Sequence, residues 1–193
     1  MKKEEVEIFY PASQQEWRQW LQGNHLSKQS VWLVYYKKKA GMPTITWSEA
    51  VDEALCFGWI DSQAKPVDEE KYMQFFCRRK SNGTWSKVNK EKIKQLVEAG
   101  RMTQAGLETI AAAQQNGSWT ILDEVEEFII PEDLAKAFDT RPGAQDFFLS
   151  LSKSVRKAIL QWLVLARQAS TRENRISEIA ESAGQQRKPK QFR

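Results

Sequence analysis

The sequence has few of the residues on which metal sites and nucleophilic catalysis depend. Its 193 residues include one histidine, His25, and two cysteines, Cys56 and Cys77. The cysteines form no Cys-x-x-Cys pair and have no histidine nearby, which argues against a zinc site. Because both lie in apolar stretches, we expect reduced, buried and inert thiols. A nucleophile with an imidazole base would have to use His25, but the Asn24-His25 pair is typical of the end of a helix.

Common enzyme motifs are also missing. The sequence has no Gly-x-Gly-x-x-Gly, no Walker loop and no His-Glu-x-x-His. The longest apolar-rich run, Ala158 to Ala166, is too short and too polar to span a bilayer. The N-terminal residues, Met1-Lys-Lys-Glu-Glu5, contain no hydrophobic region, so we expect no signal peptide and a cytoplasmic protein. The sequence therefore predicts no metal, no cofactor and no membrane span, and it assigns no catalytic residue.

A strong charge of one sign is confined to the C-terminus. The formal net charge is +4, and residues 185–193 contain four basic residues and no acid. These residues are Arg187, Lys188, Lys190 and Arg193. The rest of the chain is therefore near neutral, and we predict that residues 185–193 form a basic, disordered tail.

Nucleic acid is a less favoured partner on these grounds. The basic tail and Lys37–Lys39 could contact phosphates, and tryptophan with arginine and lysine is typical of single-strand binding. However, most of the chain is near neutral, and Trp32, Trp47 and Trp162 fall on predicted buried faces.

Hydrophobic periodicity predicts an aromatic α+β part in the first two thirds of the chain. Capping boxes at Ser13–Glu16 and Thr46–Glu49 each begin a helix, and Gly58 suits the end of the second one. β-branched and aromatic residues predict strands near 31–36, 59–64 and 71–79, with residues 61–79 forming a hairpin. The pattern does not decide between helix and strand for residues 118–130.

From Pro131 onwards the pattern is helical, and Pro131 itself suits the first turn of a helix. A long helix with a narrow apolar stripe runs to Ala169 and is followed by one more helix that ends at Gly184. We therefore predict an α+β fold, with a small, mostly antiparallel sheet covered by helices and a C-terminal all-helical module. The expected domains are residues 1–130, 131–184 and the tail 185–193.

Two neighbouring stretches predict a binding site. One helix ends at Gly58 and leaves a tryptophan and an aspartate beyond it, while a strand ends in Arg78, Arg79 and Lys80 before a polar turn. Arginine binds carboxylates and phosphates, tryptophan offers a flat apolar wall and an N–H, and asparagine both donates and accepts. The candidate ligand-binding residues are Trp59, Asp61, Arg79, Trp85, Ser86 and Asn89.

Two other interpretations of these residues stay open. In one, Arg79 pairs with Asp61 across the hairpin and the tryptophans belong to the core, so that the motif specifies only the fold. In the other, Asp61 is the acid/base of an enzyme acting on a small acidic or aromatic substrate, which requires an Asp61 side chain that faces an open cavity.

The chain resembles the YdeI/OmpD-associated, or bacteriocin-protection, family. The N-terminal part of the resemblance rests on Leu55-Cys-Phe-Gly-Trp-Ile-Asp61 and Gly100-Arg-Met-Thr-Gln-Ala-Gly106, and the C-terminal part on Pro131-Glu-Asp-Leu134 and Thr171-Arg-Glu-Asn-Arg-Ile176. The chain departs from the family pattern where Arg78 replaces a proline and Gly83 replaces a serine.

The resemblance implies a cytoplasmic protein connected with envelope stress or with tolerance to membrane-active peptides, and it implies no established reaction. We therefore expect a non-catalytic binding or stress-tolerance protein with a pocket for a small anionic or aromatic ligand. An enzyme using the same cleft and a nucleic-acid binder using the tail are the alternatives.

Overall fold

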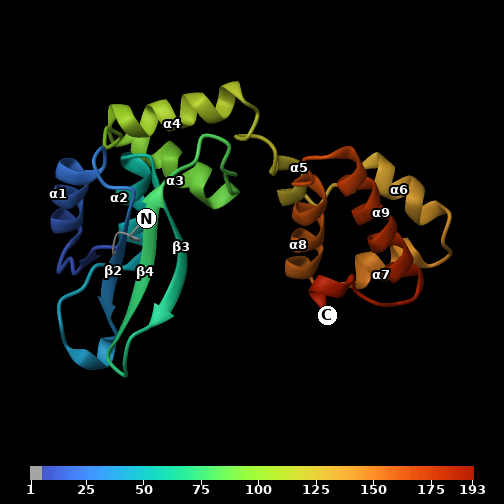
Figure 1. The fold of residues 1–193 in the computed structure, drawn as a ribbon, viewed down its shortest axis with the longest axis horizontal. Helices are drawn as coiled ribbons and strands as arrows, with labels where there is room; N and C mark the ends of the chain where they lie inside the picture. Colours follow the sequence, from blue (N-terminus) through green and yellow to red (C-terminus); the bar gives the residue numbers. More distant parts are fainter. Residues whose placement is uncertain (1–5) are drawn as a thin grey trace, which may run out of the picture. The chain divides into compact units, whose positions relative to one another are not determined.

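The computed structural model describes residues 6–193 (Figure 1). Residues 1–5, on which the expectation of no signal peptide rests, lie outside the described residues. The chain divides into two compact units, which are described separately: residues 1–83 with 88–119, and residues 84–87 with 120–193. Residues 120–130, which the sequence pattern placed with the N-terminal part, thus belong to the second unit.

A four-stranded sheet forms the centre of the first unit, in the order β1-β2-β4-β3. The strands are β1 (Ile8–Phe9), β2 (Ser30–Tyr36), β3 (Trp59–Pro66) and β4 (Lys71–Arg78). Strand β1 is parallel to β2, and the other pairs are antiparallel. The predicted hairpin, the central position of β2 and the α+β class are confirmed.

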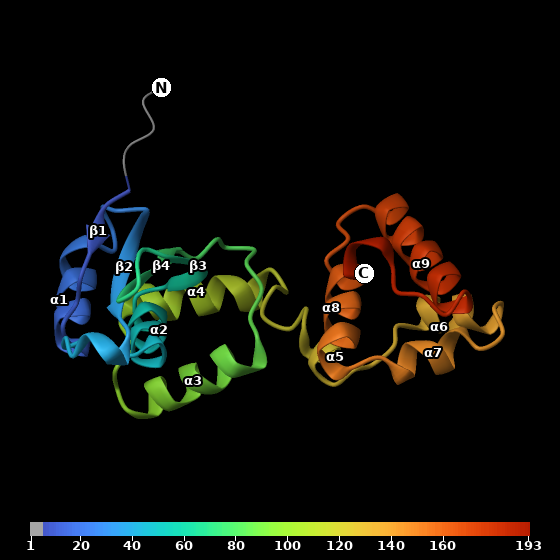
Figure 2. The same cartoon turned by 90° about the horizontal axis from the view of Figure 1, so that it is seen from below.

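Helices of the first unit cover one face of this sheet, and among the described residues of this unit no helix lies over the other face (Figures 1 and 2). The helices of the unit are α1 (Gln14–Asn24), η1 (Lys38–Ala40), α2 (Trp47–Cys56), α3 (Lys87–Glu98) and α4 (Gln104–Gln115). Trp17 and Leu21 of α1 are fully buried, and the Trp17 ring meets Phe76 of β4 at a centroid distance of 5.5 Å. Val31 and Leu33 of β2 are also fully buried, so the helix-covered face carries the core.

The predicted N-terminal caps are present. The hydroxyl of Ser13 accepts a hydrogen bond from the Glu16 N–H, and Thr46 and Glu49 form a complete capping box. Hydrogen bonds from Thr46 lower the pKa of the Glu49 carboxyl below its ordinary value. These local contacts fix where α1 and α2 begin, as the sequence predicts.

Two tryptophans are more exposed than their sequence pattern predicts. Trp47 was expected on a buried face, but 47% of its surface is exposed. Trp32 is half-buried on the face of the sheet that lacks helices, because its neighbours Val31 and Leu33 point to the core. Periodicity correctly separates the two faces of β2, but it does not say which face another segment covers.

The second unit is all-helical and has its own apolar core. Its elements are α5 (Asp123–Glu126), α6 (Glu132–Asp139), α7 (Ala144–Ser150), α8 (Lys153–Val164), α9 (Ala169–Gly184) and η2 (Lys190–Phe192). Large buried side chains from four of the helices meet there, namely Leu134, Phe138, Phe148, Ile159, Leu160, Leu163 and Ile179. The segment that the sequence left undecided contains the short helix α5.

Residues 185–193, predicted as a basic tail, include the turn η2. The Phe192 ring lies 5.8 Å from the half-buried Trp162 ring of α8, measured between centroids. Within residues 6–193, none of the helices combines the length and the hydrophobicity needed to cross a bilayer.

Candidate functional site

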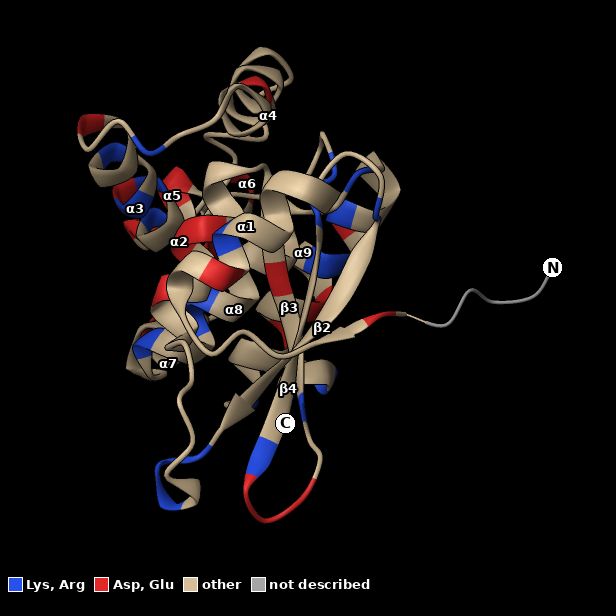
Figure 3. Ribbon diagram, turned by 90° about the vertical axis from the view of Figure 1, so that its left-hand side faces the viewer, with Lys and Arg blue, Asp and Glu red and all other residues tan. Residues whose placement is uncertain are grey.

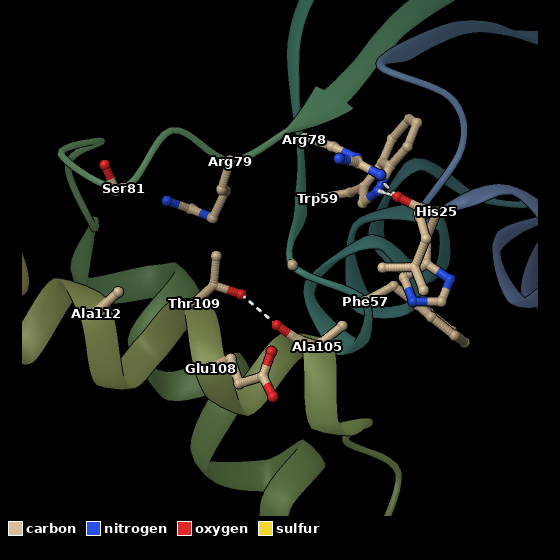
Figure 4. A pocket seen from close by; sticks show the side chains of 12 residues that line it. His25, Phe57, Trp59, Arg78, Arg79, Ser81, Ala105, Glu108, Thr109 and Ala112 are labelled. Carbon is tan, nitrogen blue, oxygen red and sulfur yellow. Dashed lines mark hydrogen bonds between the residues drawn. The ribbon is translucent and has the colours of Figure 1, made fainter.

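A pocket opens in the first unit where α2 ends, β3 begins and β4 ends. Its volume is about 310 Å³. The N-terminal half of α4 forms its floor, and the end of β4 passes above it (Figure 4). The lining residues are His25, Leu26, Phe57, Gly58, Trp59, Arg78, Arg79, Ser81, Ala105, Glu108, Thr109 and Ala112.

Two glycines bring the walls of this pocket together. Gly58 has a φ of +71°, and a Cβ there would lie 2.5 Å from Thr109 Oγ1 of α4. A Cβ on Gly106 would lie 2.3 Å from the carbonyl oxygen of Cys56. Only glycine fits either contact, because a side chain would collide with the neighbouring helix.

Hydrogen bonds also connect the end of α2 to the beginning of α4. The backbone N–H and the hydroxyl of Thr103 both donate to the Cys56 carbonyl oxygen, at 3.1 Å and 2.6 Å. The end of α2 is therefore capped by the residue that begins α4. The two motifs on which the N-terminal resemblance rests, 55–61 and 100–106, thus meet in space and form one structural unit.

Arg79 projects into the pocket from the end of β4. Its backbone N–H donates to the Gly58 carbonyl oxygen at 2.9 Å, which fixes it to the turn that follows α2. The side chain is half-buried and lies above Thr109 (Figure 4). Burial lowers the pKa of the guanidinium to about 10, against the opposing influence of Asp61. Arg79 therefore keeps its positive charge at neutral pH in a partly dehydrated setting.

Arg78 supplies a second cation to the lining. Its Nε donates to the His25 carbonyl oxygen at 2.8 Å, and the Trp59 indole N–H donates to the same oxygen at 3.3 Å. The Arg78 Nη2 atom is buried and has no hydrogen-bond partner among residues 6–193. Because this atom is buried, Arg78 mainly joins the end of β4 to the end of α1, and its positive charge adds to the electrostatic potential of the pocket.

His25 has a structural part in the pocket wall. Its backbone N–H donates to the Leu21 carbonyl oxygen, so it ends α1, as the sequence predicts. The imidazole Nδ1 lies 2.8 Å from the same oxygen. A carbonyl oxygen can only accept, so Nδ1 carries a proton in this contact.

The remaining polar groups of the lining come from α4 and from the turn after β4. The Thr109 hydroxyl lies 2.8 Å from the Ala105 carbonyl oxygen, to which it can donate. Glu108 is exposed, and its carboxylate accepts from Gln104 Nε2 at 3.0 Å. With two guanidinium groups and one solvent-exposed carboxylate, the lining carries a net positive charge.

Of the six predicted site residues, the structure brings Trp59 and Arg79 together in the lining. The Trp59 ring is only 1% exposed and packs edge-on against Trp20, so it belongs mainly to the core. Trp85 and Ser86 lie in residues 84–87, which belong to the second unit, and Asn89 lies in α3. These three residues are not among those that line the pocket.

The Asp61 carboxylate makes its hydrogen bonds outside the pocket. Its Oδ2 atom accepts hydrogen bonds from Trp47 Nε1 at 2.9 Å and from Gln74 Nε2 at 3.0 Å. It does not line the pocket. The hypothesis of an Asp61 acid/base facing an open cavity is therefore not favoured, whereas the predicted attraction between Arg79 and Asp61 contributes to the pKa of Arg79.

Sequence reasoning missed several lining residues, above all Arg78, Glu108 and Thr109. Glu108 and Thr109 belong to α4, which follows the 100–106 motif, so that motif was the signal that could have placed α4 at the end of α2. Arg78 departs from the family pattern at the strand end, and that departure could have marked it as a second cation.

The cysteines have the character expected from the sequence. Cys56 is buried and Cys77 half-buried, and neither forms a disulfide. Burial raises the pKa of both thiols, which disfavours the reactive thiolate. In the described part of the chain, no three side chains of His, Cys, Asp or Glu gather in a way that could hold a metal ion.

Comparison with known families divides the chain in two. Residues 9–109, just over half of the chain, match the model described as a domain of unknown function, DUF8412. Residues 127–186 match the model described as bacteriocin-protection, YdeI or OmpD-associated, which confirms the resemblance given above. No curated protein and no solved structure gave a significant match. The C-terminal helices are therefore similar to the bacteriocin-protection, YdeI or OmpD-associated domain, and the chain belongs to the DUF8412 family.

Proposed function

We propose that the first unit is a non-catalytic binding module whose pocket takes a small molecule with a carboxylate or phosphate group. The observation that carries this proposal is the pair of guanidinium groups, those of Arg78 and Arg79, in the lining of one pocket. A planar, bidentate anion matches the fork of an arginine side chain.

The burial of Arg79 supports the same choice. Its lowered pKa reports that the guanidinium has lost part of its hydration. An anion bound beside it restores favourable interactions for that charge, and it does so more strongly than in bulk water because the local dielectric is lower. The exposed carboxylate of Glu108 lies at the same pocket and disfavours highly charged anions.

An anionic group is a better match to the lining than an aromatic ring. Trp59 and Phe57 are 1% and 4% exposed, so neither presents a broad flat surface to a ligand. The apolar contacts come instead from Leu26, Ala105 and Ala112. Together, the flexible Leu26 side chain and the two alanine methyl groups can pack against the aliphatic part of a small acid.

The test is a binding titration that compares three forms of the protein. Isothermal calorimetry with inorganic phosphate, with citrate and with short aliphatic carboxylates should reveal at least one anion that binds the wild type. Arg79→Ala should weaken that binding by roughly 10- to 100-fold, because it removes a hydrogen-bonded charge. Arg79→Lys should have an intermediate effect, because it keeps the charge but loses the fork.

Lys80→Ala is the matched control, since Lys80 is the neighbouring exposed cation and does not line the pocket. It should leave the affinity unchanged, and both alanine variants should melt within a few degrees of the wild type. Equal effects of Arg79→Ala and Lys80→Ala would show a non-specific charge effect. A large loss of thermal stability in Arg79→Ala would show instead that this arginine serves the fold.

We further propose that ligand binding serves tolerance to membrane-active peptides from within the cytoplasm. The support is the match of residues 127–186 to the bacteriocin-protection, YdeI or OmpD-associated family model. A bacteriocin-sensitive bacterial host expressing the chain should survive a bacteriocin challenge better than one carrying the empty vector, and Arg79→Ala should remove the protection. Full protection by Arg79→Ala would show that bacteriocin tolerance does not depend on ligand binding in the pocket.

A further inference from the structure

The face of the sheet that lacks helices carries an aromatic and cationic surface that the anion pocket does not use. Register places the half-buried Trp32 of β2 directly opposite Phe75 of β4, and their rings meet edge to face at 5.0 Å. The ammonium group of Lys65 lies 4.3 Å from the centre of a Trp32 ring. Strands β2 and β4 are the two central strands, so this cluster lies in the middle of the sheet.

We propose that this outer face binds single-stranded nucleic acid. Unpaired bases stack on aromatic side chains whatever their sequence, and nearby lysines attract the phosphates. A four-stranded sheet that presents aromatic rings from adjacent strands is one established way to do this. Lys65 would then leave the Trp32 ring and contact a phosphate, while a base takes its place on the ring.

The composition of the face agrees with a polyanionic partner. By register and alternation, the outer face consists of Ile8, Ser30, Trp32, Val34, Tyr36, Ile60, Lys65, Lys71, Met73, Phe75 and Cys77. None of these residues is acidic; of the two lysines, Lys71 pairs with Asp68 of the adjoining turn at 3.5 Å, so Lys65 is the cation that faces a ligand over the rings. In Figure 3 the strands β2 and β4 are mostly free of charge colours, and a blue segment marks the Lys71 end of β4.

The same charges argue against a second copy of this chain as the occupant. A symmetric dimer through this face would place the Lys65 and Lys71 surface of one copy against the same surface of the other. Like charges brought together in this way oppose association. A single strand instead brings phosphates to the lysines and bases to the rings.

The direct test is fluorescence polarisation of a labelled oligothymidylate and a labelled oligouridylate, each of about 12 nucleotides, a length within the range of one small single-strand-binding fold. The wild type should bind at least one of them at low salt. Trp32→Leu, which keeps an apolar side chain but removes the ring, should weaken binding roughly tenfold, as for the loss of one stacked base. The affinity should fall with increasing salt, with a slope of about −0.7 per lysine–phosphate contact.

Lys65→Gln separates the electrostatic contribution to oligonucleotide affinity from the contribution of base stacking. It should reduce the salt slope by about 0.7, the contribution of one phosphate contact to a single strand. Trp47→Ala is the matched tryptophan control, because Trp47 is 47% exposed but belongs to α2 and not to this face. It should leave oligonucleotide affinity unchanged.

Four outcomes would overturn the proposal. These are no binding of either oligonucleotide at low salt, binding that Trp32→Leu leaves unchanged, equal binding of a duplex of the same length, and saturable binding of anionic vesicles in place of oligonucleotides. Circular dichroism of each variant checks that the fold is intact. If Trp32→Leu does not fold, the salt dependence measured for Lys65→Gln decides whether the proposal holds. Lys65 is an exposed residue of β3, so its substitution should leave the fold intact.

Discussion

The two units of this chain are built in different ways. The first places a carboxylate, Glu53, in its interior and joins two helices through glycine contacts. The second has a core of leucine, isoleucine and phenylalanine side chains, and its ion pair between Arg172 and Asp133 is partly exposed. The first unit is therefore held by specific contacts between particular residues, whereas the second depends more on volume and apolar character.

Glu53 illustrates these specific contacts in the first unit. Glu53 is 2% exposed and accepts hydrogen bonds from Arg18 at 2.7 Å, from Gln14 at 2.9 Å and from Arg101. Its partners thus come from α1 and from the segment before α4. A buried charge with several matched donors restricts how these segments can pack, and none of the groups can change alone.

The largest expected effect is on this buried network. Glu53→Ala should lower the free energy of unfolding by roughly 3–5 kcal/mol, because it leaves the donors of Arg18 and Arg101 without their carboxylate. Asp133→Ala in the second unit should cost less than about 1 kcal/mol, because its pair with Arg172 is partly exposed. Urea unfolding followed by tryptophan fluorescence gives both values. If both variants lost the same free energy of unfolding, the buried ion pairs of Glu53 would contribute no more to the first unit than the exposed pair of Asp133 contributes to the second.

The glycine contacts provide the second comparison. Gly106→Ala should destabilise the protein by roughly 1–3 kcal/mol, because the new methyl group would overlap the Cys56 carbonyl oxygen. Gly184→Ala, at the end of α9, meets only Arg141 side-chain atoms at 3.4 Å or more, so we expect no loss and a small gain from helix propensity. Melting curves of the two variants test this, and a harmless Gly106→Ala would mean that α2 and α4 can move apart.

The smallest expected effect is a pH dependence of the second unit. Arg172 forms two hydrogen bonds to Asp133, at 2.6 Å and 3.0 Å, and they lower the pKa of that carboxyl below its ordinary value of 3.8. A lowered folded-state pKa stabilises the fold above about pH 4, and this stabilisation is lost as the pH falls through the folded-state value. The gain is less than about 1 kcal/mol, because the pair is partly exposed.

Arg172→Gln should therefore reduce stability at pH 6 and have a smaller effect at pH 2, because protonation of Asp133 at low pH removes the attraction that the variant lacks. Urea midpoints at the two pH values measure the difference. A variant that is equally destabilised at both values would show that Arg172 acts through packing rather than through charge.

Two residues of the candidate site, Trp59 and Arg79, were predictable, and the reason is local. Gly58 ends α2, Trp59 begins β3 and Arg79 follows β4, all of which follow from caps and alternation along the chain. Arg79 was therefore placed correctly at a helix end and a strand end. The partners of Asp61 were not predictable, because Trp47 and Gln74 reach it only through the packing of α2 and the twist of the sheet.

The sequence by itself determined the elements of this protein, their caps and which residues of each strand share a face, because these depend on neighbours within a few positions. Only the tertiary structure decided that Glu53 is enclosed by arginines, that α4 forms the floor of the anion pocket and that the Trp32 face carries no helix. These features depend on contacts between segments far apart in the sequence. Periodicity can sort side chains into faces, but it contains no information on which face another part of the chain will cover.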